Sequence, residues 1–252
     1  MELNTKIAIA GYGYVGRAHA EVLSDYFEIL ISDPALGYND NIQDADALIV
    51  AVSTPESSDG SCFFGNVLSV IKNSPNIPIL VKSTISLEGW QTIKDECPDA
   101  QVTFSPEYLR AATAFEDFKD SKYFRLGGGD CDVWVKILGQ AFENCAFLLS
   151  PAEELILAKY FTNSFLATKV TFFNQIYDLC ESLNLDYNIV ARCVASDPRI
   201  GNSHTAVTKE RGFGGHCFPK DTQAISITAK NANVNLSIIN EAILYNKNIR
   251  KD

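Results

Sequence analysis

Short apolar runs alternate with amphipathic stretches over the first 150 residues of the chain. This alternation is typical of a parallel sheet flanked by helices. Strands are expected at residues 6–10, 28–32, 47–52, 79–81, 101–104, 123–126 and 147–149. Helices are expected between them at residues 15–26, 64–72, 87–96, 107–115 and 131–142. Because each strand–helix repeat is short, right-handed crossovers follow, and the pattern predicts a doubly wound α/β domain.

The pattern changes at Ser150 and Pro151. From 151 to 182 the apolar positions recur at helical spacing, with Pro151 suited to a first turn and Asn184 to a stop. Further helices are expected at 187–195, 221–231 and 235–249. Between them, residues 197–219 hold four glycines and two prolines, and so long a loop in a compact domain is usually functional. We therefore expect an α/β domain at 1–150 and an all-helical domain at 151–252.

Composition and charge narrow the class of protein. The 252 residues are 46% hydrophobic and 21% charged, which is typical of a globular protein, and the net charge of −10 without any basic run argues against nucleic-acid binding. The nearest approach to a membrane span, 155–173, is interrupted by Lys159, Asn163 and Lys169. The first residues do not have the layout of a signal peptide, and the seven cysteines show no paired spacing. Both features favour a cytoplasmic protein with reduced thiols. No metal site is expected from these cysteines or from the three histidines, His19, His204 and His216.

A G-x-G-x-x-G motif follows the first expected strand directly. Gly11 allows the tight turn, Gly13 lets a pyrophosphate approach the backbone, and Gly16 lets the next helix pack on the strand. The helix expected to start at Val15, just after Tyr14, directs N–H groups toward the anion. A strand before the motif and a helix after it favour a Rossmann-type dinucleotide site over a simple turn.

Asp33 closes the second expected strand, about 20 residues after the glycines, where a carboxylate receives the ribose hydroxyls of NAD. The same charge repels the 2′-phosphate of NADP. The alternative is a turn-forming aspartate before Pro34. Together with the glycines, Asp33 predicts NAD as the cofactor.

Cys217 lies in the segment 212–221, where glycines let the backbone approach a ligand. A helix starting near Pro219 would lie next to this thiol, with Lys220 close by. A thiol in such a place ionises readily and is a usable nucleophile. The alternative, a small buried hydrophobe, is our interpretation of the other cysteines. These are Cys62, Cys97, Cys131, Cys145, Cys180 and Cys193.

Taken together, these segments resemble the UDP-glucose/GDP-mannose dehydrogenase family. The matching motifs lie in the same order along the chain, at residues 11–16, 53–55, 82–85, 105–109, 159–170, 197–201 and 212–221. Members of that family oxidise the C6 alcohol of a nucleotide sugar, by default UDP-glucose, to a carboxylate for polysaccharide biosynthesis. Two NAD molecules each take one hydride in this reaction.

The resemblance implies a role for each matching residue. Cys217 would be the nucleophile, forming a thiohemiacetal and then a thioester. Lys159 and Asn163 would stabilise the oxyanion, and Asp221 would orient or deprotonate the water. Glu107 and Thr84 would move the remaining protons. Cofactor contacts are implied for Gly11, Gly13, Tyr14, Val15, Gly16, Asp33, Thr54, Thr84 and Lys220. Substrate contacts are implied for Glu107, Tyr108, Leu109, Lys159, Asn163, Arg199 and Gly214.

Spacing supports two pairings independently of the family. Cys217 and Asp221 are four residues apart across an expected helix start. Lys159 and Asn163 are four residues apart and so share one helix face, within an otherwise apolar stretch where polar groups need partners. In the family, the arginine that matches Arg199 reaches into the neighbouring subunit's site, which implies a homodimer. A surface arginine is the alternative for Arg199.

The chain also departs from the family pattern. Ala111 stands where relatives have a second glutamate, and the loop 199–212 is longer than usual. Relatives continue into a third domain that holds most of the substrate's nucleotide, which we expect this protein to lack. Two alternatives therefore stay open. One is a dehydrogenase of the β-hydroxyacid class that transfers a single hydride and needs no Cys217, and the other is an NAD-binding subunit with little catalysis.

Overall fold

The computed structural model describes residues 5–251, and the chain forms two compact units. Unit 1 comprises Met1–Ser57 and Cys62–Lys159, and unit 2 comprises Ser58–Ser61 and Tyr160–Asp252. Apart from the four residues Ser58–Ser61, the division falls within the helix α6 (Ala152–Leu183), after Lys159. The division at residue 150 that the sequence suggests stays a prediction.

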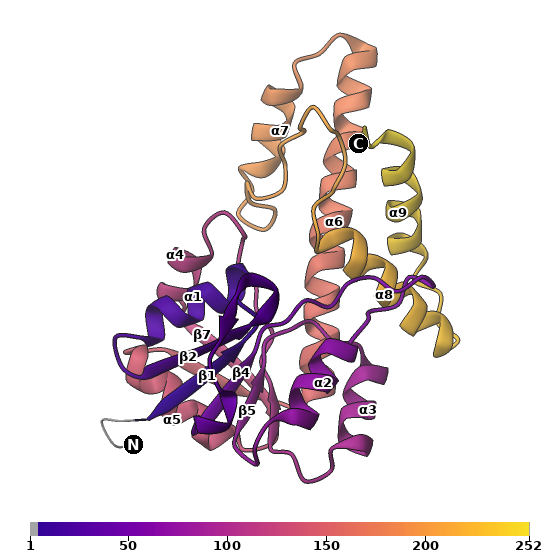
Figure 1. Ribbon diagram of the computed structural model, residues 1–252. Helices are drawn as coiled ribbons and strands as arrows, with labels where there is room; N and C mark the ends of the chain where they lie inside the picture. Colours follow the sequence, from indigo (N-terminus) through magenta and orange to yellow (C-terminus); the bar gives the residue numbers. More distant parts are fainter. Residues whose placement is uncertain (1–4, 252) are drawn as a thin grey trace. The chain divides into compact units, whose positions relative to one another are not determined.

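Unit 1 contains an eight-stranded sheet in the order β3-β2-β1-β4-β5-β6-β7-β8 (Figure 1). The strands are β1 (Lys6–Ala10), β2 (Glu28–Asp33), β3 (Tyr38–Asn39), β4 (Ala47–Val50), β5 (Ile79–Val81), β6 (Val102–Phe104), β7 (Tyr123–Gly128) and β8 (Ala146–Leu149). β1 pairs in parallel with both β2 and β4, so the strand order reverses at β1. This reversal is the switch point at which doubly wound sheets bind ligands. The doubly wound fold is therefore confirmed.

The sequence pattern suggested a parallel sheet, but two of the strand pairs are antiparallel. β7 runs antiparallel to β6, and the two-residue strand β3 runs antiparallel to β2. An antiparallel neighbour begins at the edge where the preceding strand ends, so the connection from β6 to β7 starts and ends at the carboxyl edge of β6. The loop that carries Glu107 lies in this connection.

Helices α1 (Tyr14–Leu23), α2 (Gly65–Asn73), α3 (Leu87–Glu96), α4 (Ala114–Lys119) and α5 (Cys131–Ala141) complete unit 1. The helix expected at 107–115 is wrong. Residues 105–113 form a loop, because Pro106 disfavours helical backbone before it and side chains capture the backbone amides after it. The Glu107 carboxylate accepts from Leu109 N, and the Asp117 carboxylate accepts from Arg110 N. Between this loop and β7 the structure forms the short helix α4.

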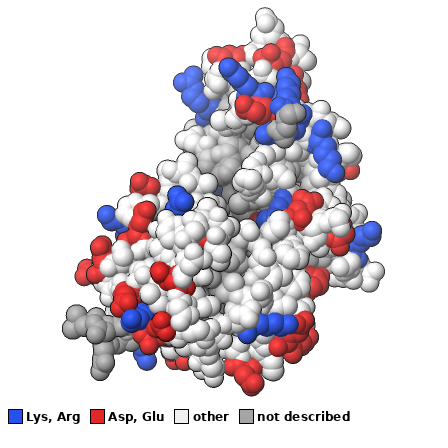
Figure 2. Space-filling model, viewed as in Figure 1, with Lys and Arg blue, Asp and Glu red and all other residues white. Residues whose placement is uncertain are grey.

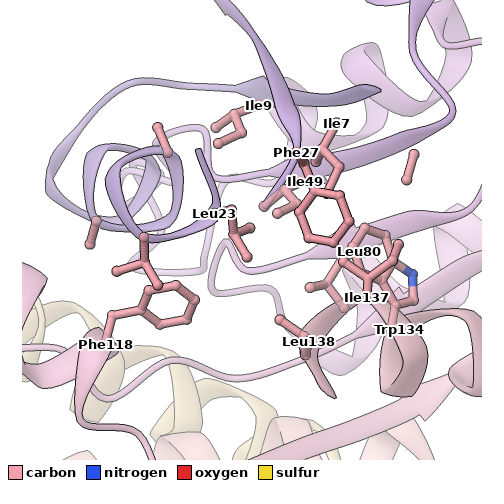
Figure 3. Packing of buried hydrophobic residues seen from close by; sticks show 14 of the residues in the cluster. Ile7, Ile9, Leu23, Phe27, Ile49, Leu80, Phe118, Trp134, Ile137 and Leu138 are labelled. Atoms are coloured by element: carbon pink, nitrogen blue, oxygen red, sulfur yellow. The ribbon is translucent and has the colours of Figure 1, made fainter. Parts of the chain in front are cut away.

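The core of unit 1 joins the sheet to α1, α4 and α5 (Figure 3). Strand residues Ile7, Ile9 and Ile49 pack there with Leu23 of α1, and all four are fully buried. Trp134 of α5 is likewise inaccessible to solvent. Burying these large side chains fixes α1 on β1, which holds the glycine-rich turn between them in one conformation.

Unit 2 is helical and includes α6 beyond Lys159, α7 (Tyr187–Ala195), α8 (Phe218–Asn231) and α9 (Ser237–Ile249). Its core brings Phe173 and Cys180 of α6 against Tyr187 and Ala191 of α7. The expected start of the helix at 221 is three residues late, since α8 begins at Phe218 with Pro219 in its first turn. An α/β fold followed by helices is confirmed.

Charged side chains of both signs are interspersed on the face drawn in Figure 2. Between residues 5 and 251, no helix has the length and apolar character needed to cross a membrane.

Candidate active site

Four sequence motifs of unit 1 follow the carboxyl ends of four parallel strands. Ala10 of β1 pairs with Val50 of β4, which pairs with Val81 of β5, which pairs with Phe104 of β6. The segments that follow carry Gly11, Thr54, Thr84 and Glu107 respectively. Because parallel strands end at one edge of the sheet, these segments line the crevice where such folds bind ligands.

The glycine-rich turn is shaped for a close ligand. Gly11 has φ +91°, and a Cβ there would lie 2.6 Å from Ala51 O. A Cβ on Gly16 would lie 2.0 Å from Gly11 O, so α1 packs as closely as only glycine permits. A Cβ on Gly13 would meet nothing within 4 Å, which leaves open space on that side of the backbone. Tyr14 and Val15 begin α1 immediately afterwards, so its positive N-terminal end adjoins this space.

Asp33 lies beside the same turn. Its Oδ2 accepts a hydrogen bond from Tyr12 N at 2.7 Å, and its side chain does not cap the short helix that Pro34 begins. The carboxylate at the end of β2 is therefore aimed at the glycine-rich turn that follows β1. An acidic group, open glycine backbone and a helix N-terminus are the donor set that fits a dinucleotide.

Glu107 and Lys159 form a buried ion pair in unit 1. Lys159 Nζ lies 3.1 Å from Glu107 Oε1, with the two side chains 5% and 7% exposed. The same ammonium donates to the main-chain oxygen of Glu107 and lies 5.0 Å from the centre of the Tyr108 ring. Leu109 N donates to Glu107 Oε2 at 2.7 Å, so both carboxylate oxygens are held. The polar groups that interrupt the apolar pattern of the helix therefore have partners.

Lys82 is a second buried lysine at this edge. Its Nζ donates to Ser105 Oγ at 2.9 Å and to Pro106 O at 3.5 Å. Burial lowers the pKa of Lys82 to about 7, although the Glu107 carboxylate acts in the opposite direction. The charges of Lys159 and Arg125 lower the pKa of Lys82 further.

In unit 2, Asn163 of α6 meets the first turn of α8. Asn163 Nδ2 donates to Asp221 Oδ2 at 2.6 Å, and Lys220 Nζ donates to Asp221 Oδ1 at 2.8 Å. Asp221 is 1% exposed. Cys217 is the N-cap of α8 and its main-chain oxygen accepts from Asp221 N, which places the partly exposed thiol residue one helical turn before the carboxylate. A cysteine at a helix N-terminus and a fixed carboxylate are thus one helical turn apart.

Arg199 is placed differently. Its guanidinium is 87% exposed and pairs with Asp197 of the same loop, through Nε at 3.0 Å and through a second nitrogen at 2.6 Å. The loop is held to α6 by Lys169, whose Nζ donates to Ile200 O at 2.7 Å. Gly214 lies further along, where a Cβ would come within 2.5 Å of the Arg250 guanidinium.

Residues 153–248 match the central domain of the UDP-glucose/GDP-mannose dehydrogenase family. A UDP-glucose 6-dehydrogenase of Rickettsia felis is 32% identical over 223 residues, which are 83% of this chain and 49% of that protein. A second, of Campylobacter jejuni, is 29% identical and is aligned over 98% of this chain and 72% of its own length.

The chain belongs to the UDP-glucose/GDP-mannose dehydrogenase family. It spans about half the length of the Rickettsia relative. A UDP-glucose dehydrogenase structure from Pyrobaculum islandicum superposes with a TM-score of 0.85 at 23% identity, covering 97% of this chain and 68% of that one. That likeness establishes a shared fold.

The family motifs fall into two groups in the structure. Unit 1 holds the glycine-rich turn, Asp33, the buried Thr54, the half-buried Thr84 and the Glu107–Lys159 pair, whereas unit 2 holds Asn163, Cys217, Lys220 and Asp221. Among residues 5–251, no group of three or more histidines, cysteines or acidic residues is arranged to hold a metal ion.

Two residues of unit 1 received no role in the sequence argument, although Lys82 belongs to the motif at 82–85. Lys82 faces the Glu107 loop, and Arg125 lies 5.1 Å from the Tyr108 ring. The signal for Lys82 was present, because a lysine that ends a fully apolar strand becomes buried with it. No such signal exists for Arg125 in the sequence, because the pattern of β7 is that of an ordinary strand.

Proposed function

We propose that this protein uses NAD to oxidise the C6 alcohol of a nucleotide sugar, by default UDP-glucose, to a carboxylate in two hydride transfers. The observation that carries the proposal is Cys217 at the N-terminus of α8, one turn before the Asp221 carboxylate that Asn163 holds. A dehydrogenase that stops at the aldehyde or ketone stage needs no thiol. One that goes on to the acid needs a nucleophile to retain the aldehyde.

NAD, when bound, accepts a hydride from the substrate carbon. Gly11, Gly13 and Gly16 would receive its pyrophosphate, and Asp33 would bind the adenosine ribose. Tyr14, Val15, Thr54, Thr84 and Lys220 are proposed as further contacts. The open space at Gly13 and the aim of Asp33 toward the turn support this assignment.

In the first oxidation the substrate alcohol loses its hydroxyl proton as the hydride leaves carbon, and the product is an aldehyde. Glu107 and Thr84 would carry that proton, directly or through water. Substrate contacts are proposed for Tyr108, Leu109, Arg199 and Gly214. The ion pair of Glu107 with Lys159 supports its part, because it keeps the carboxylate in one orientation.

The second oxidation would use Cys217. Its thiolate adds to the aldehyde carbon, forming a C–S bond and an oxyanion that Lys159 and Asn163 stabilise. Loss of the second hydride then leaves a thioester. Asp221 takes a proton from water, the water oxygen adds to the thioester carbon, and the C–S bond breaks to return the thiolate. The reaction consumes one water and two NAD⁺ and yields the acid, two NADH and protons.

We also propose a homodimer. Exposed apolar side chains of α6 recur at spacings of four and seven residues, which places them along one side of that helix. They are Phe161, Phe165, Phe172, Leu179 and Leu183, and they are 42% to 70% exposed. A second copy of the chain, presenting the same stripe, is the partner that a self-complementary surface of this kind fits.

The test is the ratio of NADH formed to sugar consumed, measured by absorbance with UDP-, GDP- and TDP-sugars and with simple hydroxyacids. We expect two NADH per nucleotide sugar. One NADH per substrate would instead assign the chain to the single-step β-hydroxyacid class. NADH binding without turnover on any substrate would indicate a non-catalytic subunit.

A further inference from the structure

Lys82 is a buried cation that the proposed reaction leaves without a role. It follows β5 directly and is 5% exposed. Glu107, Lys159, Arg125 and His19 are the titratable groups of unit 1 whose charges act on Lys82 or respond to it. None of these makes a hydrogen bond to its ammonium among the described contacts, which go to Ser105 and Pro106 instead.

The contacts of Lys82 fall on the two residues that precede Glu107. Ser105 is tied to the sheet through its backbone N, which donates to Val81 O at 3.0 Å, and through its hydroxyl, which Lys82 holds. Pro106 has no N–H, so its carbonyl is its main-chain hydrogen-bonding group, and Lys82 is the donor within reach of it. β6 ends at Phe104, and the side chain of Lys82 holds the two residues that follow by hydrogen bonds.

Glu107 follows these two residues directly, so their position also sets the position of its carboxylate. Lys159 Nζ lies 3.1 Å from Oε1 of this carboxylate, and Leu109 N donates to Oε2. Two buried lysines therefore hold this loop. Lys82 bonds to the two residues that precede Glu107, and Lys159 bonds to Glu107 itself. A loop without ladder hydrogen bonds depends on such contacts for its position.

We propose that Lys82 is a positioning residue for Glu107, which it orients by anchoring Ser105 and Pro106. This inference rests on the proposed function, in which Glu107 carries a proton of the substrate. A carboxylate displaced by even 1 Å from its reacting partner costs about 100-fold in rate. Burial of the ammonium already disfavours its charge, so replacing Lys82 by an apolar side chain of similar length leaves no orphaned counter-charge bonded to it.

The experiment compares Lys82→Met, Lys82→Arg and Ser105→Ala with a matched control, Lys136→Met, on the exposed side of α5. We expect Lys82→Met to lower kcat by tenfold to about 100-fold while KM for NAD⁺ changes less than about twofold. Lys82→Arg should recover part of the loss because it keeps donors, and Ser105→Ala should lower kcat less than Lys82→Met does. Lys136→Met should leave every parameter unchanged.

Coupling to Glu107 separates positioning from general support of the fold. In a Glu107→Gln background, Lys82→Met should lower kcat by less than about twofold, because its effect passes through the carboxylate that is already lost. A full, independent loss in that background overturns the inference. So does an unchanged kcat in the single variant.

Amide hydrogen exchange gives a readout that needs no turnover. Lys82→Met should speed exchange in the peptide covering 105–110 and leave the strands β1 and β4 unchanged. Faster exchange throughout unit 1 means that Lys82 only stabilises the fold, which contradicts the proposal. If Lys82→Met does not fold, Ser105→Ala carries both measurements. If the unaltered protein oxidises no nucleotide sugar, the proposed function fails, and the exchange pattern still decides whether Lys82 anchors the loop.

Discussion

Asn163 of α6 donates a hydrogen bond to the Asp221 carboxylate of α8 at 2.6 Å, and both side chains are buried. Lys220 occupies the other oxygen of that carboxylate. With one donor on each oxygen, Asp221 is held in a single orientation one turn from Cys217. A buried carboxylate that had only an incidental structural role would more simply be an apolar residue, because removing a charge from water is costly.

Asp221→Asn should lower kcat for NADH formation by about 100-fold to 10,000-fold, the usual contribution of a general base. The amide keeps the shape of the carboxylate but cannot take a proton from water. Steady-state NADH production measures the effect. The control is Asp25→Asn, an exposed position near the end of α1 whose replacement should change nothing. Retention of more than half the activity in Asp221→Asn would remove this residue from the mechanism.

Cys217→Ser should stop the reaction at or before the aldehyde. A serine hydroxyl is far less ionised than a thiol at neutral pH, so it does not trap the aldehyde for the second oxidation. In a single-turnover experiment the variant should form at most one NADH per active site, where the unaltered protein should form two. Cys193→Ser is the matched control, because this cysteine of α7 is exposed, whereas the sequence suggested a buried one. Two NADH from Cys217→Ser would contradict the role assigned to this thiol.

Alanine at two glycines of the turn should have different effects, one on stability and the other on cofactor binding. Gly16→Ala places a Cβ 2.0 Å from Gly11 O, so it should lower the free energy of unfolding by at least about 2 kcal/mol. Gly13→Ala meets open space and should change that free energy by less than about 1 kcal/mol, yet raise the Kd for NADH at least about tenfold by blocking the ligand's approach.

Urea unfolding and NADH fluorescence titration separate these two effects. Gly139→Ala serves as the reference, since its Cβ meets nothing in α5 and a helical alanine should stabilise the protein by about 0.5–1 kcal/mol. If Gly13→Ala binds NADH as well as the unaltered protein does, the dinucleotide does not approach the backbone at that glycine.

His19 should make stability depend on pH between about 3 and 6.5. Burial lowers the pKa of His19 from 6.5 to about 3, with the charge of Lys82 acting in the same direction. The unfolded chain therefore binds a proton over this interval while the folded protein does not. The stabilisation is complete above pH 6.5 and is lost as pH falls toward 3, amounting to a few kcal/mol.

His19→Leu should flatten that slope, as measured by urea unfolding at successive pH values. The substitution also removes the stacking on Phe118 and the contact of Nδ1 with Val15 O, so its stability at neutral pH changes as well, and the slope is the informative quantity. His216→Gln, at an exposed histidine, should leave the slope as it is. An identical slope in His19→Leu would mean that this histidine titrates normally in the fold.

Periodicity alone predicted most of the secondary structure. The strands Lys6–Ala10 and Ile79–Val81 and the helices Leu87–Glu96 and Tyr187–Ala195 begin and end where the pattern indicated. It failed at 107–115, where an apolar spacing that suits a helix is overridden by Pro106 and by side-chain oxygens that capture backbone amides. Such competition depends on where each carboxylate points, and a one-dimensional pattern does not contain that information.

The local features of the candidate site could therefore be predicted from the sequence. The glycine spacing, the acidic residue that ends β2, and a cysteine at a helix start each follow from residue type and position, because turn geometry and helix termini act within a few residues. Only the tertiary structure decided which distant groups meet. Lys82 reaches Ser105, Lys159 reaches Glu107 and Asn163 reaches Asp221 across 23 to 58 residues. Burial requires each of these polar groups to find a partner, but the packing of strands and helices selects which one.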